Sequence, residues 1–263
     1  MSLPLFAAVL GLLFHVGSKE VRRFEQLAAS DLSSRLEGLQ NKVSVQVQLG
    51  SLRPGHLKEV RILASGFRTP SLPLWTEPWR SQEGRIDRLV IRLTDFEIGD
   101  LPVRSLDIVL NDCRWDVACA VREGKIRLSR SGTGTFEAAV TEQGVRLYIV
   151  KRYPFVEVKT FKIDRYKVIF EGDLLTPLGR TNFALVAVGK PWKTTGLSLE
   201  PAYLSFANKR ISLDRNPAMN QLLNPVVDLD RDFGLRGALT IGNLKQRNQE
   251  LLLSGTAFIP AAD

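Results

Sequence analysis

The chain has 263 residues, of which 44% are hydrophobic and 24% charged, so it is long enough for a sizeable core and has the composition of a globular protein. Its formal net charge of +8 favours anionic partners such as acidic lipid headgroups or nucleic acid. Only two histidines and two cysteines are present, so a zinc site is not expected and His-dependent catalysis has few candidates.

An uncharged apolar run, from Leu3 to Val16, opens the chain. As a helix it would be about 21 Å long, which is short for the roughly 30 Å hydrocarbon core of a membrane. Residues 1–17 are therefore predicted to be a secretory signal or an uncleaved anchor, and a buried segment of a soluble domain is the alternative. If the segment is an anchor, the basic residues that follow it (Lys19, Arg22 and Arg23) predict that the rest of the chain lies on the cytoplasmic side of the membrane. If the segment is a secretory signal, the rest of the chain is exported.

A stretch of helical periodicity follows at residues 19–39, and Gly38 is its predicted stop signal. Its opposite face is polar, so we expect an amphipathic helix that buries one stripe. The stripe consists of Val21, Phe24, Leu27, Ala28, Leu32, Leu36 and Leu39.

The rest of the chain alternates between apolar and polar residues, most strictly at residues 43–49. Most strand candidates are apolar on one side, which predicts antiparallel sheet with one covered and one wet face. The predicted class is α+β and mostly β: a long, curved antiparallel sheet wrapped around the N-terminal helix, with one or two further short helices, in a single domain over residues 18–263. The further strand candidates are 57–67, 85–98, 103–110, 125–130, 156–164, 166–171, 181–188, 197–207, 235–244 and 251–259.

Three segments interrupt this pattern. Residues 69–84 contain three prolines with Trp75 and Trp79 and are predicted to be a loop. The two tryptophans either pin this loop to the body or form a foot at a membrane interface. Residues 141–153 fit a helix or a strand, and residues 216–224 fit a short helix.

The search for a catalytic or metal site is largely negative. His56 lies in a Gly-Pro turn and has the character of a surface residue, and no nucleophile-elbow, P-loop, HExxH or dinucleotide motif is present. Asp228, Asp230 and Asp232 alternate but lack the glycine and distal glutamate of an EF-hand. We predict no catalytic residue, no metal site and no cofactor, and therefore no enzyme.

Two further possibilities concern cysteines and nucleic acid. Cys113 and Cys119 are six residues apart, so they either form a small-loop disulfide in an exported protein or stay as buried thiols.

A basic β protein can bind RNA through aromatic side chains on adjacent strands. Phe155, Phe161, Tyr166 and Phe170 come nearest to such a platform, but no ribonucleoprotein-type motif accompanies them, and nucleic acid is not a predicted partner.

Five segments, in this order, resemble the LmeA-like envelope proteins of bacteria: residues 21–36, 43–67, 84–98, 131–145 and 222–235. The resemblance covers nearly the whole chain, although its motifs are patterns of strand and turn, and the Trp-rich loop departs from it. It implies a tubular lipid-binding (TULIP-like) fold around an apolar channel, and an extracytoplasmic or membrane-anchored phospholipid-binding protein of the cell envelope.

The hypothesis is therefore a non-catalytic lipid-binding protein that holds two acyl chains in an apolar channel, for lipid transfer or envelope maintenance. Its expected partners are a phospholipid or other acyl lipid and the membrane surface. The alternatives are an envelope scaffold with a filled core and a basic nucleic-acid-binding sheet. The candidate lining is Phe24, Leu27, Leu32, Leu36, Val45, Val47, Leu89, Ile91, Leu106 and Ile108. The candidates for headgroup or membrane contact are Arg22, Arg23, Arg35, Trp75 and Trp79.

Overall fold

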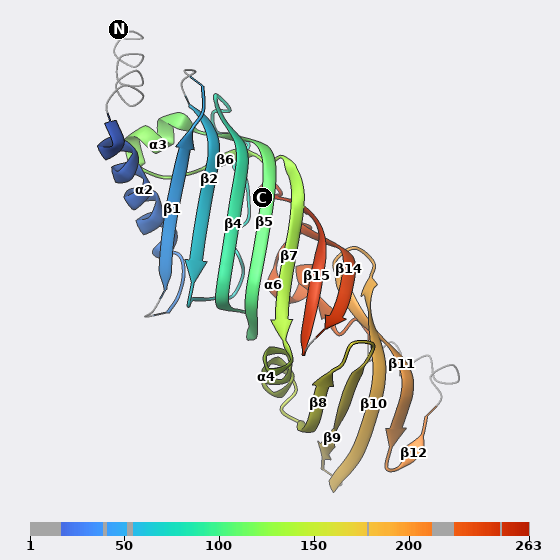
Figure 1. The fold of residues 1–263 in the computed structure, drawn as a ribbon. Coiled ribbons are helices and arrows are strands. Elements are labelled where there is room, and N and C mark those ends of the chain that lie inside the picture. Colours follow the sequence, from blue (N-terminus) through green and yellow to red (C-terminus); the bar gives the residue numbers. More distant parts are fainter. Residues whose placement is uncertain are drawn as a thin grey trace.

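The computed structural model describes residues 17–38, 41–51, 55–177, 179–211, 224–247 and 249–262. Among these residues the structure is mostly β, with 57% in strands and 17% in helices. Two sheets follow one another along an elongated molecule (Figure 1). The predicted α+β class with mostly β structure is confirmed.

The first sheet has nine strands, and its pairing is antiparallel except that β2 and β3 run parallel to β4. A parallel pair needs a crossover connection, and here the crossover carries the Trp-rich loop to the covered face of the sheet. The main strand order is β1 (Lys42–Leu49), β2 (His56–Ser65), β4 (Gly84–Ile98), β5 (Leu101–Trp115), β7 (Thr133–Thr141), β15 (Glu250–Phe258) and β14 (Leu239–Arg247), with β3 (Arg68–Thr69) on β4 and β6 (Leu128–Arg130) on β5.

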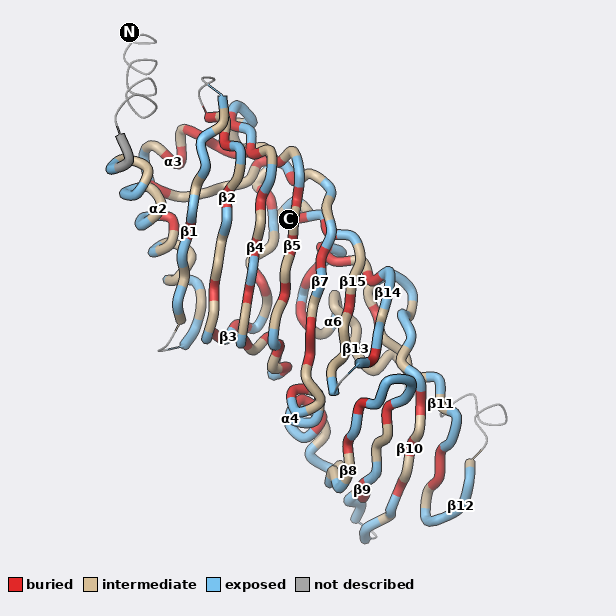
Figure 2. Tube along the Cα trace, viewed as in Figure 1, coloured by how far each residue is buried: buried red, intermediate tan, exposed pale blue. Residues whose placement is uncertain are grey.

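The two faces of the first sheet follow from the sequence alternation. In β4, Leu89 and Ile91 are buried, whereas Arg88 and Arg92, which flank this pair, are exposed. The register pairs Ile91 with Ile108 of β5 on the covered side. Buried residues alternate with more exposed residues along most of the central strands β4 and β5 (Figure 2). The predicted sheet with one covered and one wet face is therefore present.

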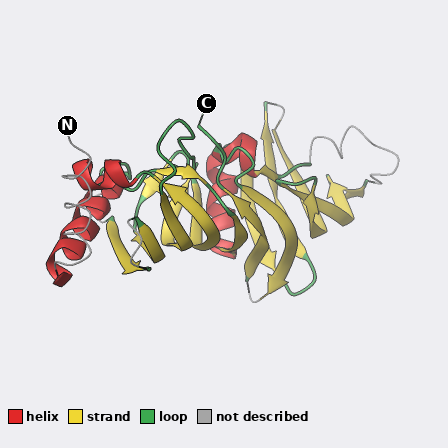
Figure 3. Ribbon diagram, turned by 90° about the horizontal axis from the view of Figure 1, so that it is seen from above, coloured by secondary structure: helices red, strands yellow, loops and turns green. Residues whose placement is uncertain are grey.

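Helix α2 (Gly17–Ser33) lies along the edge strand β1 instead of at the centre of a wrapped sheet (Figures 1 and 3). Its buried Ala28 packs in the core, and Glu25 accepts a hydrogen bond of 2.7 Å from the backbone N–H of Val47 in β1. It ends at Ser33, earlier than predicted, because the side chain of Asn41 donates to the carbonyl oxygens of Ser33 and Leu36. Leu39 lies outside the described residues.

The second sheet has six strands and is inserted in the sequence between β7 and β14. A row of phenylalanines crosses four neighbouring strands, with ring centroids 5.7 Å (Phe161–Phe170), 4.9 Å (Phe170–Phe183) and 6.1 Å (Phe183–Phe206) apart. The strands are β8 (Val156–Ile163), β9 (Val168–Thr176), β10 (Gly179–Trp192), β11 (Gly196–Phe206), β12 (Lys209–Arg210) and β13 (Val227–Asp228). The prediction of one domain over 18–263 stays a prediction.

Three short helices complete the described structure: α3 (Val117–Glu123), α4 (Glu142–Arg152) and α6 (Leu229–Phe233). Residues 141–153, which fitted a helix or a strand, form α4 because the Thr141 side chain caps it by accepting from Gly144 N–H at 3.0 Å. Apart from Asn224, the predicted helix over 216–224 lies outside the described residues.

None of the helices described is both long and apolar enough to cross a membrane. The apolar run at residues 1–16, predicted to be a signal or an anchor, lies outside the described residues.

Candidate ligand pocket

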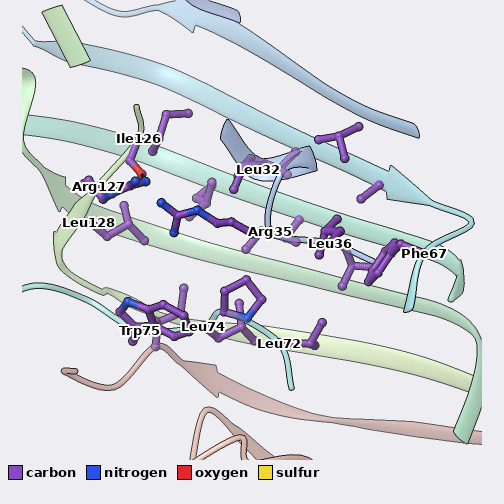
Figure 4. Close-up of a pocket in the computed structure, with 18 of the residues that line it drawn as sticks. Leu32, Arg35, Leu36, Phe67, Leu72, Leu74, Trp75, Ile126, Arg127 and Leu128 are labelled. Carbon is purple, nitrogen blue, oxygen red and sulfur yellow. Dashed lines mark hydrogen bonds between the residues drawn. The ribbon is translucent and has the colours of Figure 1, made fainter. Parts of the chain in front are cut away.

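A pocket of about 130 Å³ lies between the end of α2, the covered face of the first sheet and the crossover loop (Figure 4). All of its lining residues are apolar except Arg35, Glu77 and Arg127, so the part of a ligand that enters must be hydrocarbon-like. The apolar lining comprises Leu32, Leu36, Val43, Ile62, Ala64, Phe67, Leu72, Pro73, Leu74, Trp75, Leu89, Ile91, Leu93, Ile126, Leu128 and Ile259.

The volume of the pocket limits what it can hold. An engineered apolar cavity of roughly 150 Å³ takes up benzene, whereas sites for drug-sized molecules start at about 300 Å³. At about 130 Å³, the pocket accommodates part of one hydrocarbon chain. Two whole acyl chains, as the sequence hypothesis assumed, need more room than this pocket offers.

Charged residues form a connected series beside the pocket, here called the rim network, and three of them line it: Arg35, Glu77 and Arg127. The Arg127 guanidinium donates to both oxygens of Asp31, at 2.9 and 3.3 Å, and lies 3.7 Å from Glu77. Arg80 pairs with Glu77 and lies 3.6 Å from Asp116. Arg35 adds a contact of 3.2 Å to Asp31. In order, the rim network is Arg35, Asp31, Arg127, Glu77, Arg80 and Asp116, and its charges alternate in sign.

The rim network is electrostatically tight at Asp31. Burial alone would raise the pKa of this carboxyl, but hydrogen bonds and charge from Arg127 and Arg35 outweigh burial and lower the pKa below its ordinary value. The Asp31 and Arg127 side chains are only 14% and 11% exposed, so both charged groups have lost most of their hydration. Each group is compensated by the opposite charge of the other.

Four of the ten predicted lining residues meet at the pocket: Leu32 and Leu36 from the α2 end, and Leu89 and Ile91 from β4. The other six do not line it. Leu27 is 47% exposed and lies against Gly124. The remaining five belong to the packed core of the first sheet: Phe24, Val45, Val47, Leu106 and Ile108.

The predicted headgroup residues divide in the same way. Arg35 lines the pocket, whereas Arg22 and Arg23 are exposed on α2 and lie outside its lining. Trp75 lines the pocket and is 42% exposed, and Trp79 is 66% exposed.

The crossover loop is held by groups other than its tryptophans. Buried Leu72 and Thr76 anchor it, and the backbone N–H of Thr76 donates to Pro260 at 2.7 Å. Both tryptophans are nevertheless substantially exposed to solvent.

Sequence reasoning missed two charged lining residues, Glu77 and Arg127. Arg127 lies 96 positions from Asp31, and no local pattern links them. Leu72 and Leu74 alternate with proline in the loop, and that alternation was an available signal for residues that face the core.

His56 is more constrained than a surface turn residue. Its Nε2 lies 2.8 Å from Asp87 and its Nδ1 lies 2.8 Å from the Ser51 hydroxyl, a residue set known from hydrolases. The backbone N–H of Ser51 also donates to Nδ1 at 2.9 Å, so the single lone pair of this nitrogen is already engaged. The arrangement ties the β1–β2 turn to β4, and the hydrogen bond from His56 lowers the pKa of Asp87.

The alternating aspartates serve the backbone of α6. Asp228 caps the helix by accepting from Asp230 N–H at 3.0 Å, and Asp232 pairs with Arg231 at 2.9 Å. Among the residues that the structure describes, no group of three or more His, Cys, Asp or Glu is placed to hold a metal ion.

Both cysteines are free thiols in the structure, and no disulfide joins them. Cys113 lies in β5 and Cys119 in α3, and each is fully buried. Burial raises the pKa of both thiols. Of the two alternatives, the structure has the buried thiols.

The aromatic residues considered for nucleic acid do not form an exposed platform. Phe161 and Phe170 pack in the core of the second sheet, whereas Phe155 and Tyr166 are exposed at opposite ends of β8. Stacking with bases needs neighbouring exposed rings.

Comparison of the chain with protein-family models, with curated proteins and with solved structures returned no match.

Proposed function

We propose that this protein is a non-catalytic lipid-binding protein of the bacterial cell envelope, which takes part of an acyl chain into the pocket between α2 and the first sheet. The observation that carries the proposal is the pocket itself: an apolar space of about 130 Å³ with charged groups confined to Arg35, Glu77 and Arg127. An amphiphile needs this combination of an apolar interior and a polar rim.

The energy of binding would come from the hydrocarbon. Each buried methylene is worth about 0.8 kcal/mol, so roughly four or five methylenes contribute about 3–4 kcal/mol before any polar contact. Chain binding of this kind requires no catalytic residue.

Access from a membrane surface is supported by the crossover loop. Trp75 is both part of the pocket lining and 42% exposed, and Trp79 of the same loop is 66% exposed. Tryptophan is favoured at the depth of lipid headgroups. The apolar run before α2 and the resemblance to LmeA-like proteins are the basis for proposing an envelope location, extracytoplasmic or membrane-anchored.

A second candidate is a structural envelope protein with a filled core. The small pocket volume favours it, as does the dense packing of residues such as Ile86, Ile108 and Leu110, which are at most 1% exposed. It differs from the first candidate in predicting no bound lipid.

Lipid extraction and native mass spectrometry of the purified protein distinguish the two. A co-purifying acyl lipid, or saturable binding of a fluorescent fatty-acyl probe, supports lipid binding. Leu32→Trp, which fills the pocket from α2, should weaken probe binding at least severalfold. Leu27→Trp is the matched control, because Leu27 lies on the same helix outside the lining. If the protein carries no lipid and binds no probe, the result contradicts lipid binding and supports the structural role instead.

A further inference from the structure

Arg35 occupies a special position in the rim network, at its end and at the pocket. Its side chain is 33% exposed, and it contacts Asp31 through Nη2 alone, at 3.2 and 3.3 Å. In the described part of the chain, the other two guanidinium nitrogens have no protein partner. In Figure 4 the Arg35 side chain lies across the pocket with its guanidinium directed toward Arg127.

The other arginines of the rim network are already committed. Arg127 lies between two carboxylates, Asp31 and Glu77, and Arg80 lies between Glu77 and Asp116. Asp31 is therefore shared by Arg35 and Arg127, and Glu77 is shared by Arg127 and Arg80. Arg35 has a single acidic partner, Asp31, which also pairs with Arg127. Of the two arginines that line the pocket, Arg35 therefore has the positive charge that is less compensated.

We infer that the ligand is a single-chain amphiphile with an anionic head, a carboxylate or a phosphate, and that Arg35 binds this head while the chain enters the pocket. This inference rests on the proposed lipid-binding function. Guanidinium donors match the geometry of both anions. The pocket volume of about 130 Å³ supports one chain in place of two.

Four probes with the same ten-carbon chain test the inference: decanoate, decyl phosphate, decanol and decylammonium. Binding to the full-length protein is measured by isothermal titration calorimetry at low ionic strength. We expect decanoate and decyl phosphate to bind about tenfold more tightly than decanol, a factor equivalent to ~1.4 kcal/mol. We expect decylammonium to bind most weakly.

Arg35→Met, which keeps the length of the aliphatic stem, should remove this advantage and leave decanol binding within about twofold. Decanol binding also shows that the variant is folded. Arg61→Met is the matched control, because Arg61 is an exposed arginine of the outer face, paired with Glu59. It should bind all four probes as the unaltered protein does.

Four results would overturn the inference. If decanol binds as tightly as decanoate, Arg35 does not select the head group. If decylammonium binds most tightly, the negative charges of Asp31 and Glu77 determine which head group binds, and Arg35 does not. Inorganic phosphate is titrated in the same way, and if it binds as tightly as decyl phosphate, the anion site is independent of the chain. These three outcomes leave the proposed function intact. If none of the four probes binds the unaltered protein, the proposed function fails together with the inference.

Discussion

Asp31 and Arg127 join two elements that are 96 positions apart in the sequence, through hydrogen bonds of 2.9 and 3.3 Å. The pair fastens α2 to the segment that leads into β6, and its two side chains are 14% and 11% exposed. The same contact holds one wall of the pocket in place, because Leu32 of α2 and Leu128 of β6 both line it.

Removing Arg127 should therefore be costly. Arg127→Met leaves the carboxylates of Asp31 and Glu77 without their shared partner, and we expect the free energy of unfolding to fall by about 3–5 kcal/mol. Urea denaturation monitored by circular dichroism measures the change. Arg130→Met is the control, since the Arg130–Asp112 pair is about half exposed on both sides and should cost no more than about 1 kcal/mol. Equal losses in the two variants would contradict the structural role of Arg127.

The Asp31 carboxyl should also make stability depend on pH in the acid range. Its pKa in the folded protein lies below the ordinary value of 3.8, so its ionised form stabilises the fold above that value. This contribution is lost as the pH falls through the folded-state pKa. We expect Asp31→Asn to be less stable than the unaltered protein by the same amount between pH 7 and about pH 5, with the difference shrinking as the pH falls from there toward 3. A constant difference across urea titrations from pH 3 to 7 would show that the Asp31 charge is not responsible.

A tight glycine contact in the first sheet gives a test of its packing. A Cβ added to Gly255 of β15 would lie 1.9 Å from the carbonyl oxygen of Thr240, whereas one added to Gly242 of β14 would meet nothing closer than 3.7 Å. We expect Gly255→Ala to lower the free energy of unfolding by about 3 kcal/mol, and Gly242→Ala to change it by less than about 1 kcal/mol. Thermal and urea unfolding check both variants. Similar values would mean that the backbones of β14 and β15 are not as close as described.

The exposed tryptophan outside the pocket lining should affect membrane contact. Trp79→Ala removes a ring that is 66% exposed, and we expect severalfold weaker partitioning onto vesicles of phosphatidylcholine and phosphatidylglycerol, with stability unchanged. Vesicle cosedimentation measures the binding. Tyr166→Ala is the control, because this ring is 71% exposed on the second sheet, away from the pocket. If both variants lose binding equally, exposed aromatics act nonspecifically and the loop is not a membrane foot.

Local patterns in the sequence were sufficient for the faces of the first sheet. Leu89 and Ile91 point to the covered side because side chains alternate along a strand, and no tertiary information is needed. The start of α2 and its buried Ala28 follow equally from helical periodicity. The position of the helix could not be predicted, because its stripe fits an edge of the sheet as well as the centre.

Long-range relationships explain the remaining differences. The parallel pairing of β2 with β4 depends on the path of the crossover between them. The Asp31–Arg127 contact depends on how the fold brings two distant segments together. Residues 141–153 carried both periodicities, and only the Thr141 cap decided for a helix. Two of the three charged residues at the pocket, Glu77 and Arg127, were missed because they are brought there by the fold.

The second sheet is inserted in the sequence between β7 and β15, two strands that pair with each other. This order affects how the chain can fold while it is being synthesised on the ribosome. Thr141, the last residue of β7, is the register partner of Glu250, the first residue of β15. Residues 142–249 must therefore be synthesised while the edge of β7 has no partner on that side. An unpaired edge is a template for other strands, so we expect the nascent chain to be most prone to misassociation in the interval after β7 has emerged and before β15 follows.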